Sequence, residues 1–258
     1  MNQSKSHQSN SDESDVDALP VAVVEPALVG DLTEQDILSR VLHRDGLMLV
    51  IDKPAGLPVH RGPKGGPNLE NSFRFLQYGL PRAPVLAHRL DRDTSGCLVL
   101  GRHRKATASL GLLFKHSRIS KTYWAVVEGG PEADEGVIDM PLGRLNAERG
   151  WWMKPDPEGL PSVSNFKVLG RGDGMAWLAL EPVTGRTHQL RVHTSASGYA
   201  IVGDNIYGNG PRFGEPTLHL HAREIVIPIS KNKDPVKVTA PVPPHLQERM
   251  RACGRKGE

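Results

Sequence analysis

Short apolar stretches separated by polar, glycine-rich or proline-rich turns recur along most of this chain. Residues 47–54 (LMLVIDKP) and 121–129 (KTYWAVVEG) are rich in leucine, β-branched or aromatic residues and end at a proline or glycine, as strands often do. Further stretches of the same kind lie at 85–88, 96–102, 162–170, 175–183 and 224–229. The pattern therefore predicts a sheet of many strands.

Helical spacing of apolar residues occurs in fewer places. Residues 105–117 (KATASLGLLFKHS) carry Leu110, Leu113 and Phe114 on one broad apolar face. Three more helices are expected at 70–79, at 244–253, and at 188–198 with Thr187 near its start and Gly198 at its end. Because helices and strands do not alternate strictly, we expect an α+β fold: one domain on a mixed, mostly antiparallel β-sheet with flanking helices.

Composition divides the chain unevenly. We expect residues 1–27, which open polar, acidic and serine-rich, to be a disordered extension, 28–245 to form the compact domain, and 246–258 to be a C-terminal tail. A chain of 258 residues, 38% of them hydrophobic, can bury one sizeable core. Its net charge of +3 permits a polyanionic partner without requiring one.

Cysteine usage and hydropathy bear on the compartment. Cys97 lies in an apolar run and suits a core, whereas Cys253 lies in the polar tail, so neither a disulfide framework nor a zinc ribbon is indicated. No apolar run approaches the ~20 residues of a membrane span, and the start lacks the form of a signal peptide. We expect a soluble, monomeric, cytoplasmic protein without a membrane partner.

The most unusual stretch is VLAHRLDRDTSGCLVLG, residues 85–101, where charge is concentrated between two apolar runs. Asp91 lies between Arg89 and Arg92, and Asp93 follows. Such a run is commonly a solvated turn whose carboxylates bind nearby amides. It could instead hold a catalytic carboxylate on a loop fixed by a rigid sheet. The residues of this stretch alone leave both interpretations open.

A resemblance to a known family favours the second interpretation. HRLDRDTSG (88–96) resembles the signature of the RluA-type pseudouridine synthases. Further blocks of that family are matched in order by DKPAGLPVH (52–60), KTYWAVVEG (121–129), GRTHQLRVHTSASGYAIVGDNIYG (185–208) and LHLHA (218–222). Together these blocks span about residues 43–230, nearly all of the expected domain.

The resemblance implies an isomerase that converts uridine in RNA to pseudouridine. The base is detached from C1′, turned and rejoined through C5, so no cofactor is needed because the substrate's atoms are only rearranged. Asp91 matches the family's catalytic aspartate; whether it attacks C1′ or removes a ribose proton is left open. Burial disfavours an ionised carboxylate, so a cation has to lie nearby, and the match gives this role to Arg191.

The other site residues follow from the same match. Tyr123 is expected to stack on the flipped base. Arg89 is expected to fill the gap that base flipping leaves in the RNA stack. Further contacts to the RNA are expected from His88, Thr94, Lys121, Arg186 and His188.

The histidines offer a competing interpretation as a metal site. His219 and His221 lie on one face of an expected strand, and His188 and His193 precede them. However, the acidic ligands and spacings typical of a hydrolytic zinc site are missing. We therefore expect no metal, and histidines that hydrogen-bond the backbone or line the RNA groove. The WWMKP stretch, 151–155, either stacks on RNA or forms a hairpin over the sheet edge.

The choice of RNA and the function class remain to be considered. Many relatives of the resembled family carry an amino-terminal RNA-binding module of the S4 type, and none is recognisable in this sequence. This slightly favours a tRNA or compact stem-loop, and we expect a tRNA or rRNA stem-loop as the partner. The alternatives are a non-catalytic RNA-binding or RNA-chaperone protein with the same fold, and a metal-dependent hydrolase. The joint presence of Asp91, Tyr123 and Arg191 favours the isomerase.

Overall fold

The structure is a computed structural model, and it describes residues 30–62, 65–146, 151–230 and 232–256. The disorder expected for residues 1–27 concerns residues outside this part of the chain.

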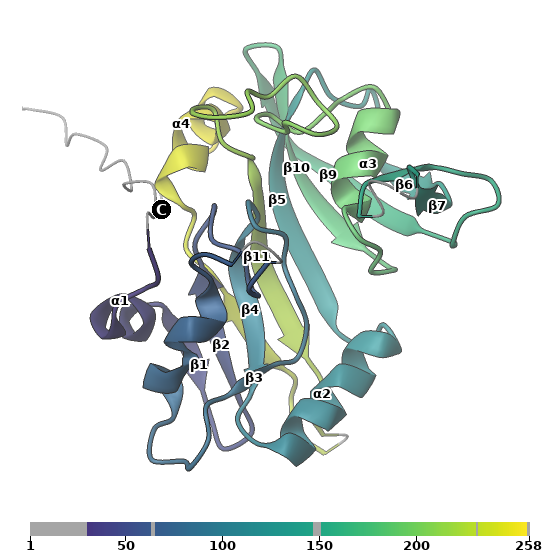
Figure 1. Cartoon of the computed structure of the whole chain (residues 1–258). Helices are drawn as coiled ribbons and strands as arrows, with labels where there is room; N and C mark the ends of the chain where they lie inside the picture. Colours follow the sequence, from purple (N-terminus) through teal and green to yellow (C-terminus); the bar gives the residue numbers. More distant parts are fainter. Residues whose placement is uncertain (1–29, 63–64, 147–150, 231, 257–258) are drawn as a thin grey trace, which may run out of the picture.

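A ten-stranded mixed sheet crosses the molecule (Figure 1). The strands follow the order β1-β2-β4-β11-β5-β10-β9-β6, with β3 beside β4 and β12 beside β11. Their bounds are β1 (Val41–Arg44), β2 (Met48–Lys53), β3 (Val85–Leu86), β4 (Ser95–Gly101), β5 (Ser120–Glu128), β6 (Glu135–Asp139), β9 (Val163–Gly172), β10 (Met175–Pro182), β11 (Leu220–Ile227) and β12 (Val236–Thr239). A separate hairpin is formed by β7 (Leu142–Arg144) and β8 (Met153–Pro155).

Helices flank this sheet. They are α1 (Glu34–Ser39), α2 (Arg104–Lys115), α3 (Gln189–Ala196), α4 (Pro244–Ala252) and the 3₁₀ helix η1 (Leu69–Leu76). The β4–β11 pair is parallel, and the other strand pairs of the described residues are antiparallel. The expected α+β class is therefore confirmed.

The predicted set of helices differs from the structure in two respects. Helix α1 was not predicted, although Thr33 and Asp36 form a capping box at its start. Helix α3 begins at Gln189, two residues after Thr187, because His188 adopts a left-handed backbone conformation with φ 53°. The expected end near Gly198 is confirmed, since Ser197 caps the helix.

The strand that follows Asp91 is central to the sheet. All residues of β4 are buried, as expected for an apolar strand with neighbours on both edges. Gly96 has φ +102°, and a Cβ atom added there would lie 2.3 Å from the carbonyl oxygen of Ala222 in β11. Glycine at this position therefore lets β11 approach β4 closely, and this contact fixes the start of β4 immediately after the charged loop.

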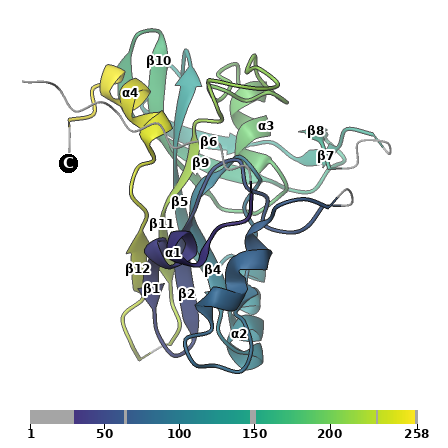
Figure 2. The same cartoon turned by 60° about the vertical axis from the view of Figure 1, so that its left-hand side comes forward.

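The two faces of the sheet carry different helices (Figure 2). Along β5, Ala125 and Val127 pack in one core cluster with Leu190 of α3, whereas Val126 packs with α4 on the opposite face. This is the period of two that a strand imposes. Trp124 also packs with the α4 cluster and therefore points away from the face of Tyr123.

The expected polar tail after residue 245 is wrong for the residues up to Cys253. Leu246 and Met250 are 0% exposed and Cys253 is 1% exposed, and all three pack against the sheet. Their spacing of four and three residues places them on one face of α4. The charged residues between them made the segment look like a tail, but it is part of the domain.

Candidate active site

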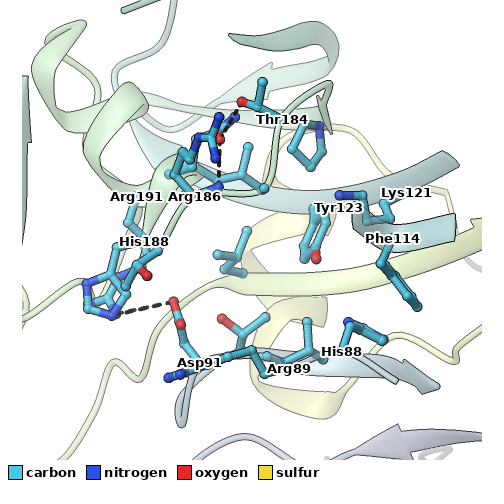
Figure 3. Close-up of a pocket in the computed structure, with 18 of the residues that line it drawn as sticks. His88, Arg89, Asp91, Phe114, Lys121, Tyr123, Thr184, Arg186, His188 and Arg191 are labelled. Carbon is cyan, nitrogen blue, oxygen red and sulfur yellow. Dashed lines mark hydrogen bonds and ion pairs between the residues drawn. The ribbon is translucent and has the colours of Figure 1, made fainter. Parts of the chain in front are cut away.

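A cavity of about 440 Å³ opens where the β3–β4 loop, β5 and the start of α3 meet. All the residues predicted for the site line this cavity: His88, Arg89, Asp91, Thr94, Lys121, Tyr123, Arg186, His188 and Arg191. Figure 3 shows the labelled residues reaching the cavity from different elements, with Asp91 facing His188 and Arg191. Segments about 100 residues apart in the chain are thus brought to one place.

Asp91 lies on a loop that is held by hydrogen bonds within the loop and from the end of β2. Its carbonyl accepts a hydrogen bond from the amide of Thr94, 3.3 Å away. Lys53, which is 0% exposed, donates from Nζ to the carbonyl oxygens of Arg92 at 2.8 Å and Pro54 at 2.7 Å. The loop is therefore anchored to the end of β2. This role of Lys53 was not predicted from the sequence, although the residue lies in a matched block.

The charged neighbours of Asp91 do not neutralise it. Arg92 forms a bidentate ion pair with Asp93, with Nε–Oδ1 and Nη2–Oδ2 distances of 2.8 and 3.1 Å. Among the described residues, the arginine that forms an ion pair with Asp91 is instead Arg191 of α3, whose Nη1 lies 3.9 Å from Oδ2 of Asp91. The structure thus brings together Asp91 and Arg191, the two residues that were predicted to pair.

Arg191 has a closer partner than Asp91. Its Nε and Nη2 donate to the two carboxylate oxygens of Asp204, at 2.8 and 2.7 Å. Arg191 is 3% exposed and Asp204 is 1% exposed, so the pair is buried. Burial alone would raise the pKa of Asp204, but the hydrogen bonds from Arg191 and from nearby backbone amides outweigh it and lower that pKa. Asp204 lies in the GDNIYG end of a matched block but was not predicted as a site residue.

Tyr123 and Lys121 line the cavity from β5. Burial raises the pKa of Tyr123 well above its ordinary value, and the charge of Asp91 adds to this shift, so the phenol stays protonated. Burial lowers the pKa of Lys121, which shares the face of Tyr123. The β5 wall of the cavity therefore offers one neutral aromatic ring and one amine.

Among known proteins, residues 47–196 match the family model described as RNA pseudouridylate synthase. An uncharacterized RNA pseudouridine synthase of Zymomonas mobilis is 41% identical over 80% of this chain and 95% of its own length. The chain belongs to the RNA pseudouridylate synthase family.

Other relatives agree with this family and with the RluA-type resemblance. The ribosomal large subunit pseudouridine synthase C of Vibrio cholerae is 34% identical over 81% of this chain and 68% of its own length. The structure of human RNA pseudouridylate synthase domain containing 1 has a TM-score of 0.68 and 30% identity, and it aligns over 87% of this chain and 90% of that one. Pseudouridine synthases isomerise uridine in RNA to pseudouridine, and this chain is one of them.

His88, which lines the synthase cavity, makes contacts within the protein that were not predicted from the sequence. Its Nε2 accepts a hydrogen bond from the amide of Val99 at 3.0 Å, and its ring stacks on Phe114 with centroids 4.2 Å apart. Burial lowers the pKa of His88 to about 3, so the ring is neutral. His88 therefore joins β4 to α2 and offers no positive charge to RNA.

Two of the histidines considered as metal ligands, His219 and His221, are bonded to protein groups. His219 Nδ1 is 2.7 Å from the carbonyl oxygen of Thr217, and His221 Nδ1 is 2.8 Å from Ser95 Oγ. No cluster of histidine, cysteine and acidic residues in the described part of the chain could hold a metal ion.

Within the same residues, no helix combines the length and the apolar character that crossing a bilayer requires.

Proposed function

We propose that this chain converts a uridine in a structured RNA to pseudouridine with Asp91 as the catalytic carboxylate. The observation that carries this proposal is the placement of Asp91 in a cavity opposite a buried cation. Arg191 lies 3.9 Å from Oδ2 of Asp91, and Tyr123 lines the same cavity. A volume of about 440 Å³ is within the range of small-ligand sites and can hold one nucleotide.

The reaction breaks one bond and forms one bond at the same carbon. The C1′–N1 bond of uridine breaks, the base turns within the cavity, and C1′ bonds to C5. The C5 proton is lost and N1 gains a proton, so the atoms balance. Asp91 acts either at C1′ as a nucleophile or on a ribose proton as a base. In both routes Arg191 stabilises the carboxylate's charge in a site that water reaches poorly.

The side chains at the cavity mouth suit a flipped nucleotide. Arg89 is exposed on the Asp91 loop, where a planar guanidinium can replace the flipped base in the stack. Tyr123 presents its ring to the bound base. Lys121, in β5, and Arg186, just before α3, supply positive charge for phosphates or base oxygens. Thr94 is 2% exposed, so its part is to shape the loop that carries Asp91.

The RNA is proposed to be a tRNA or rRNA stem-loop. Support comes from the positive side chains around the cavity and from relatives that are named ribosomal large subunit pseudouridine synthase C. We further propose that the chain acts as a monomer and that it acts in the cytoplasm on these RNAs.

The proposal is tested by release of tritium from RNA labelled at uridine C5, using unmodified cellular RNA. Wild-type protein is expected to release label, and Asp91→Asn is expected to release none while RNA binding stays within about twofold. Asp93→Asn is the matched control, because Asp93 lies on the same loop but pairs with Arg92. Label release by Asp91→Asn would refute the assignment. RNA binding without release by the wild type would favour the RNA-binding or chaperone alternative.

A further inference from the structure

Two nitrogen donors converge on one oxygen of the Asp91 carboxylate. One belongs to His188, just before α3, and the other to Arg191, within α3. His188 Nε2 lies 3.7 Å from Oδ2 of Asp91, and Arg191 Nη1 lies 3.9 Å from the same atom (Figure 3). Among the described residues, no hydrogen bond or ion pair reaches Oδ1. The carboxylate is thus approached from one side, and its second oxygen is left for a bound nucleotide.

The protonation of His188 can be deduced from its hydrogen-bond chain. The amide of Met153, in β8, donates to the hydroxyl of Tyr207 at 2.9 Å, and that hydroxyl lies 2.8 Å from Nδ1 of His188. A backbone amide only donates, so the Tyr207 oxygen accepts there. Its own hydrogen has no other acceptor among the described residues and is directed to Nδ1. Nδ1 is therefore an acceptor, and the proton of a neutral imidazole is on Nε2, facing Asp91.

The surroundings keep this ring neutral and away from solvent. Burial raises the pKa of the Tyr207 phenol, which therefore keeps its hydrogen. Burial lowers the pKa of His188, although the charge of Asp91 opposes this shift. The His188 side chain is only 8% exposed, and its ring lies perpendicular to the Trp151 ring at a centroid distance of 5.8 Å. A side chain enclosed in this way presents little surface to RNA.

The turn at residues 204–207 positions both donors, His188 and Arg191. Asp204 binds Arg191 through its two oxygens and accepts the backbone amides of Ile206 and Tyr207 through Oδ1, at 2.9 and 3.0 Å. The same turn thus orients Arg191 directly and His188 through Tyr207. The left-handed backbone of His188, with φ 53°, directs its ring toward this turn and is a strained conformation for a residue other than glycine.

We propose that His188 is a positioning residue that acts through Asp91: a neutral Nε2–H donor, its tautomer fixed by Tyr207, that with Arg191 holds Oδ2 so that Oδ1 faces the substrate. This inference rests on the proposed role of Asp91 and replaces the predicted role of His188 as an RNA contact. The separation of 3.7 Å is longer than a hydrogen bond, and it shortens when RNA fills the cavity, as catalytic contacts often do.

Single-turnover kinetics separate positioning from RNA binding. His188→Leu is expected to lower the single-turnover rate constant about tenfold, the scale of one hydrogen bond to a charged group, with the Kd for RNA within about twofold. His188→Gln is expected to recover most of the rate, because its amide nitrogen can reach the place of Nε2. Tyr207→Phe is expected to lie between the two. A raised Kd with an unchanged rate constant would overturn the proposal, as would equal rates for the Leu and Gln variants.

The tautomer itself is measurable without turnover. Nitrogen-15 NMR of the full-length wild-type protein is expected to show His188 as a neutral ring protonated on Nε2 between pH 7 and 8, with the resonance shifted by Asp91→Asn. A ring protonated on Nδ1 or on both nitrogens would overturn the proposal even if His188→Leu failed to fold. Because this readout needs no activity, an inactive wild type would refute the proposed function, while the tautomer result would still test whether the proton of His188 is on Nε2.

Discussion

At the scale of the single residue, Asp204 is the buried counterion that keeps Arg191 in place. Asp204 is 1% exposed and forms a bidentate pair with Arg191, so removing its charge leaves a buried guanidinium with only the more distant Asp91. Loss of one partner of a buried pair typically costs ~3–5 kcal/mol of stability. The chemistry proposed for Asp91 therefore depends on an acid that does not line the cavity.

We expect Asp204→Asn to lower the free energy of unfolding by about 3 kcal/mol and to reduce tritium release strongly, because Arg191 loses its main partner. Urea denaturation and the release assay measure both effects. Asp134→Asn is the control, since Asp134 pairs with Arg171 at 3.0 Å but its side chain is 88% exposed. That variant should change stability by less than about 1 kcal/mol. Equal losses in the two variants would contradict the role given to Asp204.

Lys53 is a second buried ionisable residue, and it contacts the backbone of the loop that carries Asp91. Burial lowers the pKa of Lys53 from its ordinary value to about 7, with the nearby charges of Asp93 and Asp91 opposing the shift. Between pH 7 and about 10 the unfolded chain binds a proton on this lysine that the folded chain does not. This difference in proton binding means that the contribution of Lys53 to the free energy of unfolding rises with pH over that interval.

We therefore expect the difference in unfolding free energy between wild type and Lys53→Met to increase from pH 7 to pH 9, measured by urea denaturation. Lys237→Met should show no such increase, because Lys237 is 64% exposed and paired with Glu224. Lys53→Met should also lower tritium release at both pH values, since the carbonyl of Arg92 loses its donor. A pH-independent difference would mean that Lys53 is charged throughout this range.

These two residues show what could be predicted from the sequence and what could not. Asp91, Tyr123 and Arg191 were assigned by matching motifs, and the structure places all three on one cavity. Asp204 and Lys53 lie in matched blocks too, but their roles depend on burial and on contacts with residues 13 and 39 positions away. Neither burial nor such contacts follow from the spacing of residues along the chain.

At the scale of the element, apolar alternation predicted most of the main strands, while helix α4 shows its limit. The helix was predicted, but its burial was not, because Glu248, Arg249 and Arg251 dominate the composition of the segment. Its apolar residues pack on β5 and the neighbouring strands, on the face opposite α3. The helix thus supports β5, the strand that carries Tyr123 and Lys121 on its other face.

We expect Leu246→Ala to lower the free energy of unfolding by about 2–4 kcal/mol, because it empties a fully buried site beneath β5. Thermal or urea denaturation measures the change. Glu248→Ala, on the exposed face of the same helix, should alter stability by less than about 0.5 kcal/mol. If Leu246→Ala were as mild as the control, α4 would be a dispensable tail, as its composition had indicated.

At the scale of the whole molecule, the cavity exists because the sheet brings distant segments together. The β3–β4 loop carries Asp91, and the parallel β4–β11 pair places this loop beside the antiparallel β11–β5 pair, from which Tyr123 projects. Strand order of this kind depends on long-range contacts, so only the resemblance to a family could anticipate it. Arg89 lines this cavity and is exposed on the loop that carries Asp91.

We expect Arg89→Lys to lower the single-turnover rate constant about tenfold, because an ammonium keeps the charge but cannot stack in place of the flipped base. In the described structure, no ion pair or side-chain hydrogen bond occupies the Arg89 guanidinium. The slope of log Kd against log salt should stay unchanged, since the number of phosphate contacts is the same. Arg251→Lys is the control, because α4 lies on the opposite face of the sheet. If Arg89→Lys were fully active and Arg89→Ala reduced the salt slope by about one, Arg89 would contact a phosphate, and another group would have to fill the vacated stack.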